Sequence, residues 1–356
     1  MNFTLRQRGR ALMDFEVAVR LAAGRLQMRA ERELADKGVS ADTLPDDMDE
    51  RHRVIDKALA GSPVFEARAL LGEWTAKQHG LAAVQAFDEL RGEIVPEIER
   101  LREGATTLTH HDFAAPDYWS KIWFHRTHGG WDGGDYNGFV HGEIVHRKYV
   151  SKVFPGDVYA NRRTVLHSLP RADYRRILEI GTSSGHHTLA IAEVFPHAKL
   201  TGVDPSLRML EQAQRVGNEK GFDWNLHTAI GEDMPMFADD SFDLVTAYAI
   251  HHEMPVKSIQ AIFAEAFRVL EPGGDMIMAD IARTHTLDRM TAWRFDWLAR
   301  WGGEPFWRST ARLDMVPMAQ AAGFVDVRGW HPRAGADPYI IYGRKPAAKA
   351  AMEAGK

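Results

Sequence analysis

Residues 175–206 combine two acidic side chains with a glycine turn, in the order RRILEIGTSSGHHTLAIAEVFPHAKLTGVDPS. Glu179 ends one apolar run and Asp204 ends the next, while Gly181 and Gly185 lie in the turn that follows the first run. A carboxylate in the place of Asp204 can accept hydrogen bonds from both hydroxyls of a ribose, and Glu179 can attract an ammonium group directly or through water. The pattern therefore predicts a site for a ligand that carries both a ribose and an amino acid.

The glycine spacing argues against a dinucleotide. A dinucleotide fingerprint has glycines at its first, third and sixth positions, so that a pyrophosphate can lie on the following helix N-terminus. Counted from Gly181, the third position is Ser183 and the sixth is His186. A nicotinamide-dependent oxidoreductase would share the acidic Asp204, and it remains the alternative from another enzyme class.

Two adjacent histidines could supply a general base. His251 and His252 are followed by Glu253 and come directly after the apolar run FDLVTAYA. In an open α/β sheet, ligands bind beyond the carboxyl ends of the strands, where an imidazole could remove a proton from a hydroxyl group. A positioning or purely structural role for the pair is the alternative.

Aromatic residues and histidines are concentrated in DYWSKIWFHRTHGGWDGGDYNGFVHGEIVH, residues 117–146, among many glycines. This composition predicts a lid that closes over a bound acceptor. A second aromatic group, Trp293, Trp297 and Trp301, recurs at steps of four on a predicted helix, with arginines nearby that could meet a carboxylate. The candidate acceptor-binding residues are Tyr118, Trp123, His128, Tyr136, Trp293 and Trp297. Core packing between domains is the alternative for the tryptophans.

The histidine-rich segment raises the question of a metal. The side chains that could offer nitrogen or oxygen ligands are His125, His128, Asp132, Asp135, His141, Glu143 and His146. Their spacings match no compact ligand motif, and a step of five does not place His141 and His146 on one face of an α-helix. No metal is therefore predicted.

The composition limits the classes of protein. The chain has 356 residues, no cysteine and a formal net charge of -5, so it has neither disulfides nor the basic balance of a general nucleic-acid binder. No apolar run reaches the roughly 18 residues of a membrane span, and the first residues lack the apolar core of a signal peptide. A cytoplasmic protein with a small-molecule partner is expected, without nucleic acid or membrane as partners.

The chain divides near residue 155. Residues 1–155 are predicted to form a helical N-terminal domain with the lid, including helices at 47–60, 63–78 and 81–103. The apolar stripes of these helices exceed what one small bundle needs, which favours a homodimer; packing within the chain is the alternative. Residues 156–346 form the second domain, and 347–356 a frayed tail.

Strand-like runs alternate with helical ones from residue 176 onward. The runs are RILEI, KLTGV, WNLHTAI, FDLVTAYA, GDMIMADIA, VDVRGW and YIIYGR. Such alternation predicts an α/β fold with a doubly wound, mostly parallel sheet.

In these features the chain resembles the class I S-adenosylmethionine (SAM)-dependent methyltransferases, in particular the small-molecule branch that includes ubiquinone-biosynthesis-type enzymes. The resemblance covers roughly residues 156–346. It is carried by the loop from Glu179 to Gly185, by Asp204, and by GEDMPMFADDSFDLVTAYAIHHE and AFRVLEPGGDMIMAD in that order. It implies a Rossmann-like methyltransferase sheet, with SAM as the methyl donor.

The resemblance also implies which residues bind the cofactor. They are Glu179, Gly181, Thr182, Ser183, Gly185, Asp204, Gly231, Glu232 and Asp233. Ser183 stands where the family has its middle glycine, so either the backbone there does not need a positive φ or the loop runs differently. Of the two acids that could receive the adenine amino group, Glu232 is favoured over Asp233.

The sequence therefore predicts a SAM-dependent methyltransferase that acts on a small molecule. O-methylation is the first candidate because His251 or His252 could serve as the base, as a histidine in this region does in the O-methyltransferases that the chain resembles. Methylation of sulfur, nitrogen or carbon stays open. A protein that binds SAM or another metabolite without catalysis is a further alternative.

Overall fold

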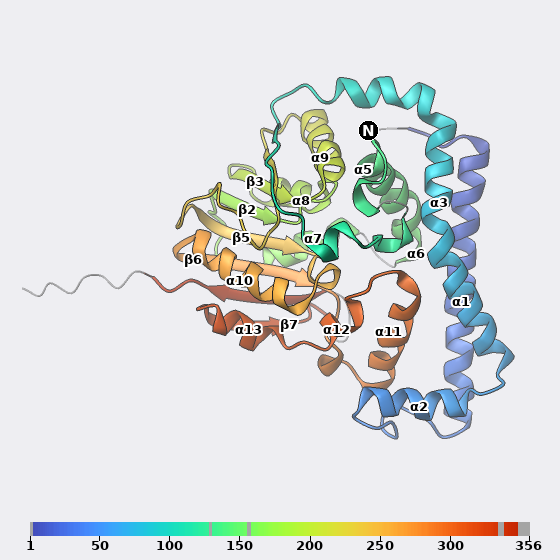
Figure 1. Ribbon diagram of the computed structural model, residues 1–356. Helices are drawn as coiled ribbons and strands as arrows, with labels where there is room; N and C mark the ends of the chain where they lie inside the picture. The colour runs from blue at the N-terminus through green and yellow to red at the C-terminus, as the bar shows by residue number, and fades with distance from the viewer. Residues whose placement is uncertain (1–2, 128–129, 155–157, 334–337, 348–356) are drawn as a thin grey trace, which may run out of the picture.

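The computed structural model describes residues 3–127, 130–154, 158–333 and 338–347. Its N-terminal part is built from three helices: α1 (Gln7–Asp36), α2 (Met48–Ala58) and α3 (Pro63–Arg100). The side chains of Asp47 and Ser62 cap α2 and α3 by accepting hydrogen bonds from backbone amides of the first turn. Figure 1 shows α1 and α3 side by side along one edge of the molecule.

The long helix α3 corrects one expectation. The sequence predicts separate helices at 63–78 and 81–103, whereas α3 continues through Gly80. A glycine costs a helix only about 1 kcal/mol relative to alanine, and contact with α1 offsets this cost. Ala83 and Ala86 of α3 are fully buried in a cluster shared with Met13 of α1.

The sheet has eight strands in the order β1-β4-β3-β2-β5-β6-β8-β7 (Figure 1). The strands are β1 (Thr107–Thr109), β2 (Arg176–Ile180), β3 (Lys199–Asp204), β4 (Asn225–Thr228), β5 (Phe242–Tyr248), β6 (Leu270–Asp280), β7 (Val325–Trp330) and β8 (Tyr339–Arg344). Within the described chain, β8 runs antiparallel to both of its neighbours, β6 and β7, and the other pairs of strands are parallel. The doubly wound, mostly parallel sheet and all seven predicted strands are confirmed.

One strand was not predicted. β1 belongs to the part of the chain that was expected to be entirely helical, and it pairs in parallel with β4 at the edge of the sheet. It has only three residues, so it offers too short a pattern for strand alternation to be recognised.

Helices cover both faces of the sheet. On one face lie α7 (Val158–His167), α8 (His186–Val194) and α9 (Leu207–Lys220); on the other lie α10 (Val256–Val269) and α13 (Met315–Ala321). Each face has its own apolar core, with Leu210 and Ile191 in the first and Phe263 and Met315 in the second. No helix in the described part of the chain is long and apolar enough to cross a membrane.

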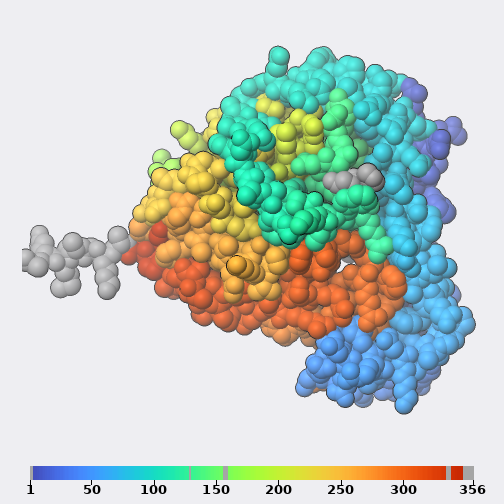
Figure 2. All heavy atoms as spheres, in the orientation of Figure 1, coloured from blue at the N-terminus to red at the C-terminus, as the bar shows by residue number. Residues whose placement is uncertain are grey.

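The remaining helical elements are α4 (Asp117–Ser120), η1 (Phe124–Arg126), η2 (Gly130–Asp132), α5 (Asn137–Phe139), the π-helix η3 (Val140–Val150), α6 (Ser151–Val153), η4 (His251–Glu253), η5 (Thr284–Thr286), α11 (Arg289–Gly302) and α12 (Trp307–Ala311). Figure 2 shows the teal segment that follows α3 lying over the yellow and orange part of the sheet domain. Asp132 of the predicted lid segment accepts a hydrogen bond at 2.6 Å from Ser206, which follows the end of β3.

The helix α11 joins the N-terminal helices to the sheet domain. Trp293 and Trp297 are buried in a cluster with Leu34 of α1 and Ile55 of α2. Of the two roles considered for these tryptophans, the structure shows core packing between the two parts of the chain. The boundary near residue 155 stays a prediction.

Candidate functional site

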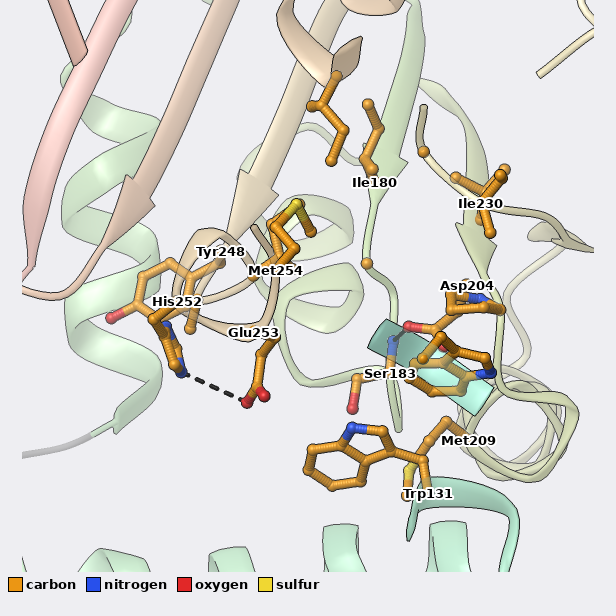
Figure 3. Close-up of a pocket in the computed structure, with 18 of the residues that line it drawn as sticks. Trp131, Ile180, Ser183, Asp204, Met209, Ile230, Tyr248, His252, Glu253 and Met254 are labelled. Atoms are coloured by element: carbon orange, nitrogen blue, oxygen red, sulfur yellow. Dashed lines mark hydrogen bonds and ion pairs between the residues drawn. The ribbon is translucent and has the colours of Figure 1, made fainter. Parts of the chain in front are cut away.

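A cavity of about 280 Å³ lies beyond the carboxyl ends of the central parallel strands, where the order of the strands reverses beside β2. This is the position at which open α/β sheets bind ligands. Figure 3 shows Ser183 and Asp204 at one end of the cavity, with His252 and Glu253 at the other.

The turn after β2 presses its backbone against the cavity. Gly181 has a φ of +78°, and a Cβ atom there would overlap the side chain of Ile250. Ser183 has a φ of +49° although it is not a glycine. The position of the family's middle glycine therefore does require a left-handed backbone here, which excludes the first explanation offered for Ser183. A serine held in this region costs about 1 to 3 kcal/mol, so the surrounding structure must impose it.

Asp204 ends β3 and lines the cavity. Its Oδ2 accepts from the Ser183 amide and its Oδ1 accepts from the Ser206 amide, both at 2.8 Å. A carboxylate oxygen has two acceptor positions, so each oxygen keeps one for a ribose hydroxyl. Burial raises the pKa of Asp204 to about 7, even though the two amide donors lower it. The capping of α9 falls to Ser206, whose hydroxyl accepts from the Met209 amide, which leaves Asp204 free for a ligand.

The two acids considered for the adenine differ in position. Glu232 lines the cavity, as does Gly231, and its Oε1 accepts a hydrogen bond from the Tyr118 hydroxyl at 2.5 Å. Tyr118 lines the cavity as well, whereas Asp233 does not.

Glu179 lies behind the glycine turn rather than in the cavity. Its Oε2 accepts from the Thr188 hydroxyl at 2.6 Å, and its side chain is fully buried. Burial raises the pKa of Glu179 to about 8, so the side chain is largely neutral at pH 7 and is poorly suited to attract an ammonium. Thr182 and Gly185 also lie outside the cavity lining.

The structure places the two adjacent histidines in different surroundings. His252 lines the cavity, and its Nδ1 lies 2.6 Å from Asp280 Oδ1. Burial favours the neutral ring, but Asp280 and Glu253 outweigh it and raise the pKa of His252 well above its usual value. His251 does not line the cavity, and burial lowers its pKa to about 4. At neutral pH the histidine that faces the cavity therefore carries a proton, which is the wrong state for a base.

Two other histidines in the cavity are neutral. His141 and His146 both line it, and burial, together with neighbouring imidazoles and arginines, lowers both pKa values well below 6.5. Their ring centroids are 4.6 Å apart, which contradicts the expectation that the two side chains cannot share a face. That expectation assumed an α-helix, but residues 140–150 form a π-helix, whose bonds link each residue to the fifth one along.

Several further lining residues were not among the predicted site residues: Trp131, Arg162, Tyr248, Glu253 and Met254. Trp131 belongs to the segment expected to act as a lid, so its aromatic composition was a usable signal. Arg162 and Tyr248 had no such signal because they lie on a helix and a strand that look ordinary in sequence.

The other predicted acceptor-binding residues lie elsewhere. Trp123 is 54% exposed and does not line the cavity. Tyr136 packs against Phe87 of α3 with ring centroids 5.5 Å apart. Trp293 and Trp297 belong to the core described above, and His128 lies outside the described residues. Tyr118 is the one described member of the predicted acceptor set that lines the cavity.

Comparison with known proteins gives the family of this region. Residues 177–274 match the family described as "Methyltransferase domain". The chain is 33% identical over 106 residues to the ubiquinone/menaquinone biosynthesis C-methyltransferase of Desulfotalea psychrophila, covering 30% of this chain and 41% of that protein. It is 33% identical over 119 residues to the malonyl-acyl-carrier-protein O-methyltransferase of Legionella pneumophila, covering 33% and 40%.

Among solved structures, phosphoethanolamine N-methyltransferase 2 of Haemonchus contortus in complex with S-adenosyl-L-methionine aligns with a TM-score of 0.45 and 17% identity, covering 60% of this chain and 58% of that one. This chain spans about two fifths of the length of the two curated relatives. The matched residues contain the glycine turn, Asp204, Glu232 and His252.

Proposed function

We propose that this chain, which carries a class I SAM-dependent methyltransferase domain, transfers the methyl group of SAM to a small-molecule acceptor. The observation that carries the proposal is a single cavity that joins Asp204 and Glu232 at one end to His252 and Glu253 at the other. SAM supplies an electrophilic methyl group when it is bound. The two carboxylates suit SAM, because Asp204 keeps free acceptor positions for the ribose hydroxyls and Glu232 can accept a hydrogen bond from the adenine amino group.

Calorimetric titration of the purified chain with S-adenosylhomocysteine (SAH), with NADH as a parallel ligand, tests the cofactor. Micromolar binding of SAH alone is expected. Binding of NADH alone would overturn the proposal in favour of an oxidoreductase. Turnover of labelled SAM with an acceptor would exclude a protein that binds SAM without catalysis.

Replacement of Asp204 by alanine is expected to weaken SAH binding by about 1.5 to 3 kcal/mol, which is about 10- to 150-fold in Kd. The variant removes both acceptor oxygens that face the ribose. Calorimetry measures the change, with Asp233→Ala as the matched control, since Asp233 lies outside the cavity lining. Equal SAH affinities for the wild type and Asp204→Ala would show that Asp204 does not bind the ribose.

SAH affinity is also expected to depend on pH through Asp204. The ionised carboxylate accepts hydrogen bonds from ribose hydroxyls, and burial raises its pKa to about 7. Below that pH the group is protonated in the free protein, so binding must expel a proton, and Kd should be roughly tenfold higher at pH 6 than at pH 8. Titrations across this range check the slope, and Asp204→Asn, which cannot titrate, should flatten it. A slope that persists in Asp204→Asn would assign the effect to another group.

We further propose a hydroxyl oxygen as the atom that is methylated, with sulfur, nitrogen and carbon as alternatives. The neutral imidazoles of His141 and His146 support this choice, because a hydroxyl must lose its proton as it is methylated. Labelled SAM offered with matched panels of phenols, aliphatic alcohols, thiols and amines distinguishes the alternatives by the mass and fragmentation of the product. Product from amines or thiols alone would overturn the oxygen assignment.

A homodimer also remains part of the proposal. Large apolar side chains are exposed on the two long helices, namely Phe15 and Met28 on α1 and Leu70 and Leu81 on α3. A second copy of the chain could cover them. Light scattering after size-exclusion chromatography should give twice the chain mass, and a monomer mass at micromolar concentration would exclude the dimer. The cytoplasmic location stays a prediction.

A further inference from the structure

A cluster of histidine and glutamate side chains occupies the acceptor end of the cavity. One donor atom from each of His125, Glu253 and Glu304 lies within 4.8 Å of the other two. His125 Nε2 is 3.2 Å from Glu253 Oε1, and His125 Nδ1 is 3.0 Å from Glu304 Oε1. The three residues come from η1, η4 and the loop after α11, so this group is assembled only by the fold.

The backbone is strained where it holds this cluster. His125 and Arg126 are consecutive non-glycine residues with φ values of +50° and +55°. The His125 amide donates to the Gly303 carbonyl at 3.1 Å, which ties η1 to the residue before Glu304. Each left-handed non-glycine residue costs about 1 to 3 kcal/mol, and such strain accumulates at functional sites and ligand clamps.

A fourth donor stands beside the group. His252 Nε2 lies 3.4 Å from Glu253 Oε1 and 3.8 Å from Glu304 Oε2. Figure 3 shows the dashed contact between the His252 ring and Glu253. The other ring nitrogen of His252 faces Asp280 at 2.6 Å, which is the arrangement in which a metal-binding histidine is oriented by a second carboxylate.

We propose that His125, Glu253, Glu304 and His252 bind one divalent transition-metal ion, which displaces a proton from each imidazole nitrogen that it binds. Imidazole nitrogens with carboxylate oxygens suit Zn²⁺, Mn²⁺ or Fe²⁺ better than Mg²⁺ or Ca²⁺, which prefer oxygen alone. Donors bound at about 2.0 to 2.2 Å around a tetrahedral ion lie roughly 3.3 to 3.6 Å apart. The separations of 3.2, 3.4 and 3.8 Å between donors of the cluster are close to this range. Glu304 Oε1 faces the other ring nitrogen of His125 at 3.0 Å, so Nε2 of His125 and Oε2 of Glu304 are the atoms that would bind the ion.

Two carboxylate oxygens of the cluster favour the binding of a cation. Glu253 Oε2 and Glu304 Oε2 are buried and have no hydrogen-bond partner among the described residues. A buried carboxylate oxygen without a partner is costly, and a cation removes that cost.

The cluster can be reached from two sides. His125 lines the cavity described above and also a second cavity of about 240 Å³, which Glu304 lines as well. Three protein ligands leave a tetrahedral ion one position for a ligand from solution, and with all four the ion would have to become five-coordinate to accept one. If the proposed function holds, an oxygen of the acceptor would take that position, where the ion polarises the hydroxyl and orients it. Binding of the ion itself does not depend on methyl transfer.

The test is calorimetry of the full chain, stripped of metal with a chelator, against ZnCl₂ and MnCl₂ in turn. One equivalent of Zn²⁺ or Mn²⁺ should bind at micromolar Kd or tighter, and Glu304→Gln should weaken binding more than tenfold. His111→Gln is the matched control, since His111 faces His227 at 3.0 Å near the sheet edge and could collect Zn²⁺ adventitiously. Wild-type affinity in Glu304→Gln, or loss of the site in His111→Gln, would overturn the proposal.

A second measurement needs no variant. The visible spectrum of the Co²⁺-loaded wild-type chain should show the intense bands of four- or five-coordinate Co²⁺ rather than the weak spectrum of the hydrated ion. A spectrum of hydrated Co²⁺ alone would leave a protonated His125 bridging two glutamates as the correct description. Titration of the metal-free chain with SAH is an independent measurement. It tests the methyltransferase proposal alone, so failure of the metal site can be told apart from failure of that proposal.

Discussion

Replacement of Trp293 by alanine is expected to lower the free energy of unfolding by about 3 to 5 kcal/mol, the usual cost of deleting a large aromatic side chain from a core. Trp293 is fully buried, and its ring centroid lies 6.2 Å from that of Trp297 and 6.4 Å from that of Phe65. The core around it joins α11 to α1 and α2. The cavity left by the variant would therefore weaken the junction between the N-terminal helices and the sheet domain.

Urea denaturation followed by circular dichroism measures this change. Trp123→Ala is the matched control, because Trp123 is 54% exposed and should shift stability by less than about 1 kcal/mol. The pair distinguishes the two roles that the sequence leaves open for Trp293. Unchanged stability together with weaker acceptor binding would return Trp293 to the acceptor site.

The parts of the fold that the sequence predicted are those with a local cause. The strand from Arg176 to Ile180 is an apolar run followed by a glycine turn, and the strand that ends at Asp204 repeats the pattern. An apolar run, a turn and a helical stretch can each be recognised from residues close together in the sequence, so the end of the second strand, and with it Asp204, could be placed at the cavity from the sequence alone.

The parts that the sequence did not predict depend on contacts between distant segments. The spacing of Trp293 and Trp297 is compatible with a role in the core and with a role in a pocket. Only their packing on α1 and α2 decides between these two roles. His141 and His146 share a face only because residues 140–150 adopt a π-helix, which the usual 3.6-residue period cannot reveal.

The end of the cavity that holds His252 and Glu253 was the hardest part to predict for the same reason. His125, Glu253 and Glu304 are separated by long stretches of chain, so no spacing connects them. The adjacent pair His251 and His252 drew attention because it is visible in the sequence, yet one ring faces the core and the other is held protonated. Of the two adjacent histidines, only His252 lines the cavity. Its contacts with residues far apart in the sequence depend on the fold.

Replacement of His141 by glutamine is expected to lower kcat about 10²- to 10⁴-fold with a hydroxyl acceptor, the usual contribution of a positioned general base. His141 lines the cavity, and burial together with His146 lowers its pKa well below 6.5, so the ring is neutral at pH 7 and has a nitrogen free to accept a hydrogen bond from a hydroxyl. The low pKa makes the ring a weak base in the ligand-free chain, so the prediction rests on its position in the cavity. Its edge-to-face contact with Trp131, at 4.8 Å between ring centroids, fixes its orientation.

Steady-state kinetics with the first hydroxyl acceptor found in the labelled-SAM screen measure the effect, while calorimetry checks that SAH affinity changes less than about twofold. His111→Gln makes the same substitution at a residue that does not line the cavity, and it should leave kcat unchanged. Because a base acts only in the chemical step, the loss should appear in kcat and kcat/KM together. Wild-type kcat in His141→Gln would show that the proton leaves by another route. His146→Gln would then be the next variant, since its ring is the neutral neighbour of His141 in the same cavity.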